Sequence, residues 1–448
     1  MNAHALLIKE ITASAISLTG GAGDYSSLMK MIGDAHFVLI GEATHGTDEF
    51  YRTRAELTKY LIQHKGFSGV AVEADWPDSY RVNRYVRGDA NIHNAHSALA
   101  EFARFPAWMW RNEVMVEFAD WLRDYNQTCA TEHEKTGFYG LDVYSLRASI
   151  KAVIAYLDRV DPEAARQARH YYGCFDRYRK DDPQEYGYAS SSGLTPTCER
   201  EVIEQLVALR QHAFDYMKRD GFSAGEEFFC AEQNARVIVD AERYYRAMFA
   251  SRVSSWNLRD RHMVDTLYAL ADHLGRQRGE RAKIVVWAHN SHIGDARATE
   301  MGEGGEWNIG QLVREHHGRD AALVGFSTCR GTVTAASNWD GPAERKTVRP
   351  AMRESYEALF HETGIKNFLL LLRDNGVLIR HLSLSRLQRA IGVIYLPETE
   401  RQSHYFFSRL PEQFDAIIHL DETHALKPLE PGGLWHKGEA FETYPTGL

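Results

Sequence analysis

The 448-residue sequence lacks any apolar run near the roughly 18 residues that a membrane-spanning helix needs. Phe368–Leu372, for example, is a run of strand length that Arg373 ends. The first twenty residues carry Lys9 and Glu10 in their middle, which does not fit the basic start and apolar centre of a signal peptide. We therefore expect no membrane association and a location in the cytoplasm.

Cysteine is also scarce. No two cysteines form a Cys-x-x-Cys pair, which excludes a zinc knuckle and a thioredoxin-type redox site. An odd number of widely spaced cysteines favours reduced, mostly buried thiols. The five are Cys129, Cys174, Cys198, Cys230 and Cys329.

Basic residues are not in excess. The 52 Lys and Arg residues are outnumbered by 61 Asp and Glu residues, which gives a net charge of −9. A negative field repels phosphate, so we expect no nucleic-acid partner. No glycine-rich phosphate loop follows any of the predicted strands.

What the sequence does contain is a series of short apolar runs, each followed by polar residues. The first two, His36–Ile40 and Gly69–Glu73, flank an amphipathic helix over residues 50–64, which is typical of a βαβ unit with a buried parallel sheet. Further strands are predicted at Gly137–Leu141, Lys283–Ala288, Ala321–Gly325, Asn367–Leu371, Gly392–Tyr395 and Asp415–His419.

Residues 144–279 have an almost wholly helical pattern, with one flexible break predicted at Tyr186–Pro196. We predict an α/β fold with a mainly parallel central sheet flanked by helices. Residues 1–143 and 280–448 would form the two parts of the core. Residues 144–279 would be a helical insertion that forms a wall or lid of the cleft.

Four predicted strands end in carboxylates or imidazoles. The carboxyl ends of parallel strands meet at one edge of a sheet, where α/β proteins bind ligands, so we expect these side chains to face one cleft. A cap or a loop hydrogen bond is the alternative role for each residue taken alone. The residues are Glu42, His45, Glu73, Asp75, Asp142, His289, Asn290 and His292.

Glu42 and His45 lie three residues apart in a glycine-bounded loop. A carboxylate at this spacing can orient an imidazole as a general base, although a purely structural histidine is the alternative. Either Arg54 or Arg52, near the start of the following helix, can act as an anion clamp.

His289 and His292 form an i, i+3 pair directly after a strand. Such a pair can bind a metal, donate to an oxyanion or hydrogen-bond the backbone. The sequence Gly221-Phe222-Ser223-Ala224-Gly225 matches the nucleophile elbow of serine hydrolases, but the end of a charged helix precedes it where a buried strand is required. We interpret it as a turn between helices.

Five segments together resemble a known family, and they extend over nearly the whole chain. They are Ile40-Gly41-Glu42-Ala43-Thr44-His45-Gly46, Val72–Trp76, Trp287–His292, Ser403–Phe406 and Phe414–Thr423. On these motifs the chain is similar to the erythromycin esterase family. The segments Arg104–Trp110 and Asp75–Pro77 resemble its chromosomal members, some of which are described through succinoglycan biosynthesis.

The resemblance implies an α/β core with an additional helical part, and hydrolysis by water without a serine nucleophile. His45 would be the general base, oriented by Glu42 or Glu73. His289, His292 or Arg54 would stabilise the oxyanion. The site residues that the resemblance implies are Glu42, His45, Arg54, Glu73, His289 and His292.

The function that we predict is hydrolysis of a small-molecule ester, lactone or acylated sugar, with no required cofactor. One alternative is a hydrolase that depends on a divalent metal, or a transferase, acting on a sugar-derived small molecule. The other is a non-catalytic protein that binds a ligand in the same cleft.

Overall fold

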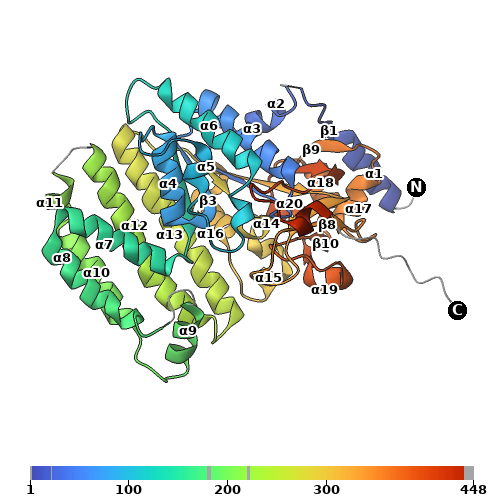
Figure 1. The fold of residues 1–448 in the computed structure, drawn as a ribbon. Coiled ribbons are helices and arrows are strands. Elements are labelled where there is room, and N and C mark those ends of the chain that lie inside the picture. The colour runs from blue at the N-terminus through green and yellow to red at the C-terminus, as the bar shows by residue number, and fades with distance from the viewer. Residues whose placement is uncertain (1–2, 22, 179–182, 219–221, 438–448) are drawn as a thin grey trace.

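The computed structural model describes residues 3–21, 23–178, 183–218 and 222–437, and its centre is an eight-stranded sheet (Figure 1). Every neighbouring pair from β12 to β4 is parallel, and β9 and β1 add an antiparallel edge. The predicted α/β fold with a mainly parallel sheet is confirmed. The strand order is β1 (Ile16–Ser17), β9 (Asn367–Leu371), β12 (Ala416–Leu420), β6 (Ala321–Ser327), β2 (Phe37–Ile40), β5 (Ile284–Trp287), β3 (Gly69–Asp75) and β4 (Gly137–Asp142).

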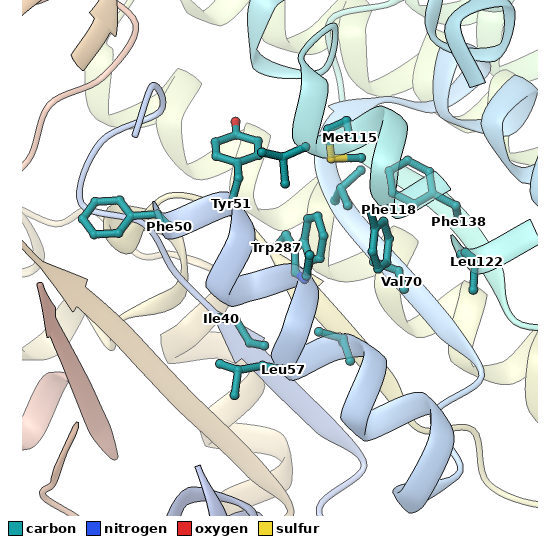
Figure 2. Packing of buried hydrophobic residues seen from close by; sticks show 14 of the residues in the cluster. Ile40, Phe50, Tyr51, Leu57, Val70, Met115, Phe118, Leu122, Phe138 and Trp287 are labelled. Atoms are coloured by element: carbon teal, nitrogen blue, oxygen red, sulfur yellow. The ribbon is translucent and has the colours of Figure 1, made fainter. Parts of the chain in front are cut away.

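Both faces of the sheet are covered, which explains why its strands are apolar without alternation. In β2, Val38 and Ile40 join one hydrophobic core while Phe37 and Leu39 join the other. Figure 2 shows the first core, where the indole of Trp287 lies close to Phe118. The first core is covered by α2 (Ser26–Ile32), α3 (Asp48–Lys65), α4 (Trp76–Val86), α5 (Ala95–Leu99) and α6 (Glu113–Gln127), and the second by α1 (Ala3–Ser14), α13 (Arg252–Arg278), α16 (Ile309–His317) and α17 (Tyr356–His361).

A third core belongs to the helices between β4 and α13, which lie together beside the sheet (Figure 1). In contrast, α13 packs Met263, Leu267 and Leu270 into the second core of the sheet. The helices of the third core are α7 (Leu146–Val160), α8 (Pro162–Tyr172), α9 (Pro183–Ser191), α10 (Glu199–Gln211), α11 (Ala213–Met217) and α12 (Phe222–Ala247).

The prediction of a strand at Gly392–Tyr395 is wrong. Ile391 and Ile394 make only isolated bridges, and the strand in this region is β10 (Arg386–Arg389), paired with β11 (Tyr405–Ser408). The sequence of β10 is polar because Arg389 is buried through hydrogen bonds rather than through apolar contacts. The remaining sheet has the order β13 (Glu422–Thr423), β7 (Arg330–Ala335) and β8 (Glu344–Val348).

The flexible break predicted at Tyr186–Pro196 is wrong for residues 186–191, which belong to α9, whereas residues 192–196 do form a turn after that helix. Tyr186 is buried and its hydroxyl donates to Glu242 over 2.5 Å. A Cβ on Gly187 would lie 2.1 Å from the carbonyl oxygen of Tyr245, so this glycine permits a close helix contact. Tertiary packing therefore fixes a segment whose composition indicates a loop.

The expectation of reduced thiols fails for Cys174 and Cys198, which form a disulfide with Cα atoms 6.0 Å apart. Cys174 lies in a turn after α8 and Cys198 is the N-cap of α10. The packing of these helices brings the two together across 24 residues, which their spacing alone does not reveal. Cys129, Cys230 and Cys329 are free thiols.

The Gly-x-Ser-x-Gly sequence does not follow a strand. Gly221 lies outside the described residues, and α12 begins at Phe222, after the short helix α11. The context of a nucleophile elbow is therefore missing in the described part of the chain. Within that same part, every helix is too short or too polar to span a lipid bilayer.

Candidate active site

The loop after β2 positions Glu42 and His45. Its last residue, Gly46, must be a glycine because a side chain would not fit there. A Cβ on Gly46 would lie 1.8 Å from the carbonyl oxygen of Thr334. The carbonyl of Gly46 accepts hydrogen bonds from the backbone of Thr334 and of Leu426, at 2.9 and 2.8 Å. The loop is thus held rigidly against β7, which fixes the side chain of His45.

His45 is held by Glu42, and Glu42 is held by Arg54. Nδ1 of His45 donates to Oε1 of Glu42 over 2.9 Å, and Oε2 of Glu42 lies 2.6 Å from Nη2 of Arg54. Glu42 and Arg54 are each 1% exposed, and the guanidinium lies over the rings of Tyr51 and Trp287. Because the Nδ1 proton is engaged, Nε2 of His45 presents a lone pair, as a general base requires.

The other predicted arginine, Arg52, has a half-exposed side chain that pairs with Asp48 and Glu117. Arg54 is therefore the arginine of the site, and Glu42 is the carboxylate that pairs with His45.

Glu73, in β3, is fixed by three groups. It accepts from Nη2 of Arg259 over 2.7 Å and from the backbone N–H of His289 over 2.8 Å, and it lies 3.3 Å from Nε2 of His292. Burial alone would raise the pKa of Glu73, but His292 and Arg259 hold it well below its usual value. Glu73 is therefore a poor base, and its geometry suits a residue that positions His289.

His289 is a neutral hydrogen-bond donor. Its Nδ1 accepts the backbone N–H of Ser291 over 3.2 Å, so the ring proton lies on Nε2. Burial and the adjacent His45 lower its pKa to about 3, although the Ala43 carbonyl acts in the opposite direction. Nε2 has no well-formed hydrogen bond to any described residue, and the rings of His45 and His289 lie 4.8 Å apart. This N–H is buried beside His45 and lies near the Ala43 carbonyl.

His292 is the charged member of the histidine pair. Its Nδ1 lies 3.0 Å from both carboxylate oxygens of Asp260, and the indole of Trp256 stacks on its ring. Burial would lower the pKa of His292, and Arg259 acts the same way, but Asp260 and Glu73 raise it to about 9. The raised pKa favours the imidazolium, which would anchor Glu73, whereas Nη1 of Arg259 lies 3.0 Å from Nε2 of the same ring, a contact that suits a neutral ring.

The sequence analysis did not single out Arg259 and Asp260, both in α13. Arg259 donates from Nε and Nη2 to the two oxygens of Asp142, at 2.9 and 2.7 Å, as well as to Glu73. The sequence does contain a pattern that could have identified Asp260, because this residue shares one helix face with Met263 and Val264 at i+3 and i+4. A carboxylate on an apolar face needs a buried partner.

Two pockets meet at His45, Glu73 and Arg259, which line both of them. One has a volume of about 210 Å³ and the other of about 730 Å³. The smaller pocket is also lined by Asp75, Asp78, Phe102, Arg104, Phe105, Trp110, Asp142, Tyr144 and Trp339. The larger pocket is also lined by Arg252, Trp256, His289, Ser291, His292, His404, Tyr405 and Phe406.

The smaller pocket holds a second ionic pair and a carboxyl group of unusual pKa. Arg104 binds both oxygens of Asp75, and the ring of Tyr144 lies within 5 Å of the guanidinium groups of Arg104 (4.7 Å) and Arg259 (4.9 Å). Burial and the adjacent Asp75 raise the pKa of Asp78 to about 8. Tyr144 and the first half of α13 are the parts of residues 144–279 that form a wall of the cleft.

The structure thus brings all six predicted site residues into one network, with Arg259, Asp260 and Asp142 as further members. In the described part of the chain, the group of His, Cys, Asp and Glu residues with metal-ligand spacing is Cys329, His361 and Asp421, and it includes none of the six.

The family model for erythromycin esterases matches residues 62–423. The chain belongs to the erythromycin esterase family. This membership supports a hydrolase of the esterase type with a small-molecule substrate. The matched range contains Glu73, His289 and His292, whereas Glu42, His45 and Arg54 precede it.

The relatives cover most of the chain at low identity. Erythromycin esterase type II of Escherichia coli is 24% identical over 322 residues, which are 70% of this chain and 73% of that protein. A solved succinoglycan biosynthesis protein is 24% identical with a TM-score of 0.74, covering 95% of this chain and 98% of its own. A histidine-to-asparagine mutant of an erythromycin esterase, in its open conformation, is 18% identical with a TM-score of 0.61, covering 92% and 95%. These solved structures share the fold.

Proposed function

We propose that this protein hydrolyses an ester or lactone with a water molecule activated by His45. The observation that carries the proposal is the chain of contacts from Arg54 through Glu42 to His45. It engages Nδ1 of His45, a residue that lines both pockets where they meet. No serine nucleophile takes part.

In the proposed reaction, Nε2 of His45 takes a proton from water, and the resulting hydroxide attacks the carbonyl carbon. The oxyanion of the tetrahedral intermediate accepts a hydrogen bond from Nε2–H of His289. A donor of this kind typically contributes about 3 kcal/mol to the stability of the transition state. The intermediate collapses, the bond to the alkoxide breaks, and the His45 imidazolium returns its proton to the alkoxide.

The substrate that we propose is a hydroxyl-rich ester, lactone or acylated sugar. Five aromatic side chains line the smaller pocket and offer flat apolar surfaces for a sugar ring or a macrocycle. The fold is shared with a protein named for succinoglycan biosynthesis, which favours a saccharide. The larger pocket leaves room for the second part of the substrate across the scissile bond.

The test compares purified wild-type protein with His45→Ala, using a chromogenic acetate ester, acetylated sugars and macrolides, with and without a chelator. We expect turnover that persists with chelator and falls by about 10²–10⁴-fold in His45→Ala. His93→Ala, which changes an exposed histidine, is the matched control and should keep wild-type turnover.

Other outcomes would separate the alternatives. Loss of turnover with chelator, restored by a divalent metal, would favour a metal-dependent hydrolase. Sugar binding without turnover, unchanged in His45→Ala, would favour a non-catalytic ligand-binding protein.

A further inference from the structure

A separate cluster of side chains that can bind a metal lies beyond the carboxyl ends of strands β6 and β12. The proposed active site also lies at the carboxyl ends of the sheet strands. Cys329 follows β6 by two residues, Asp421 follows β12 directly, and His361 is the last residue of α17. One donor atom from each residue lies within 4.8 Å of the others. Cys329 is 4% exposed and Asp421 is 8% exposed, so the cluster is largely shielded from water.

A second imidazole lies beside this cluster. His419, in β12, is 0% exposed, and its Nε2 has no hydrogen-bond partner among the described residues. A buried polar atom without a hydrogen-bond partner destabilises the fold. The Nε2 atom lies 3.5 Å from Oδ1 of Asp421, and Nδ1 of the same ring lies 2.8 Å from the hydroxyl of Ser327. With Ser327 as acceptor, Nδ1 carries the ring proton and Nε2 presents a lone pair.

We propose that Cys329, His361, His419 and Asp421 bind a zinc ion. In a tetrahedral site with bonds of about 2.0–2.3 Å, neighbouring ligand atoms lie about 3.3–3.7 Å apart. The 3.5 Å between His419 and Asp421 already meets this requirement. The hydrogen bond that Nδ1 of His419 donates to the hydroxyl of Ser327 is the outer-shell contact that fixes a ligating imidazole.

Binding requires three changes in the cluster. His419 contacts Asp421 but stands outside the group whose donor atoms lie within 4.8 Å of one another, so its ring must move closer to Cys329 and His361. Nδ1 of His361 lies 2.6 Å from Oδ1 of Asp421, and the ion would replace the proton that these atoms share. The side chain of His361 is 46% exposed at a helix end, so it can move outward to make room. The Cys329 thiol would also lose its proton to solvent, which gives one thiolate, one carboxylate and two neutral imidazoles around Zn²⁺. The site would then carry no net charge.

Four protein ligands would fill the tetrahedral coordination shell of the zinc ion. This arrangement is typical of structural zinc sites, whereas catalytic sites keep one position open. The ion would join the ends of β6 and β12 to α17. It would stabilise the fold and leave the chemistry at His45 unchanged.

The experiment titrates the full-length protein, with the Cys174–Cys198 disulfide intact, with Co²⁺ as a spectroscopic substitute for Zn²⁺. We expect one equivalent to bind with a thiolate charge-transfer band in the near ultraviolet, and Zn²⁺ to displace it and raise the melting temperature. Cys329→Ser should lose the band and bind at least about tenfold more weakly. Cys129→Ser, which changes a free thiol outside the cluster, should behave as the wild type.

His361→Ala tests the same site at a half-exposed position where folding is not at risk, and it should also weaken Co²⁺ at least about tenfold. Absence of binding by the wild type would overturn the proposal. A charge-transfer band that persists in Cys329→Ser would overturn it as well.

Discussion

Arg259 binds both carboxylate oxygens of Asp142, at 2.9 and 2.7 Å, across 117 residues of sequence. The pair joins α13 to the end of β4, and Nη2 of the same guanidinium also reaches Glu73. One side chain therefore connects the helical part of the protein, the edge of the sheet and the network around His45.

Arg259→Met should destabilise the protein by about 3–5 kcal/mol, because it leaves the carboxylates of Glu73 and Asp142 buried without their partner. Urea unfolding monitored by circular dichroism measures the loss. Adding Asp142→Asn to this variant should restore part of it. The control is Arg252→Met, on the same helix, where the side chain is 82% exposed. Equal stabilities of the Arg259 and Arg252 variants would contradict this role of Arg259.

Glu42→Gln should lower kcat by about 10²-fold or more and leave KM for the ester nearly unchanged. The amide can donate to Nδ1 of His45, which moves the ring proton to Nε2 and removes the base. Steady-state kinetics across pH measure the effect, and Glu117→Gln, at an exposed position, is the control. Wild-type kcat in Glu42→Gln would refute the proposed orientation of His45.

His292 makes the stability of the protein depend on pH. Its pKa is about 9 in the folded chain and near 6.5 when unfolded, so its contribution is complete below pH 6.5 and is lost as pH rises through 9. The wild type should lose on the order of 3 kcal/mol over this range relative to His292→Gln. Unfolding curves at pH 6, 7.5 and 9 test this, and parallel pH profiles of the two proteins would disprove it.

Asp78→Asn should stabilise the protein, increasingly so as pH rises from 4 to 8. The carboxyl has a pKa of about 8 when folded against 3.8 in the unfolded chain, so wild-type stability falls across this range and then levels. We expect a gain above about 1 kcal/mol at pH 8 and almost none at pH 4. Melting temperatures measure it, with Asp34→Asn, 98% exposed, as the control. A gain independent of pH would contradict the shifted pKa.

The sequence predicts those features that arise from contiguous residues. The apolar runs identify the strands because both faces of the sheet are buried, and the loop from Gly41 to Gly46 stands out because two glycines bracket Glu42 and His45. Arg259 was missed because its partners are distant in sequence, so only the fold makes it part of the site. The strand β10 was missed because hydrogen bonds, rather than apolar contacts, bury Arg389.

The charged groups of the network around His45 do not balance. Four carboxylates stand against three cations, so with neutral His45 and His289 the set carries one net negative charge. In the smaller pocket Arg104 neutralises Asp75, and the raised pKa keeps Asp78 uncharged near pH 7. A negative field of this kind would repel phosphorylated or sulfated sugars and leave the entry of uncharged esters unaffected, so under the proposed function the cleft would favour uncharged substrates. The charged residues are Glu42, Glu73, Asp142, Asp260, Arg54, Arg259 and His292.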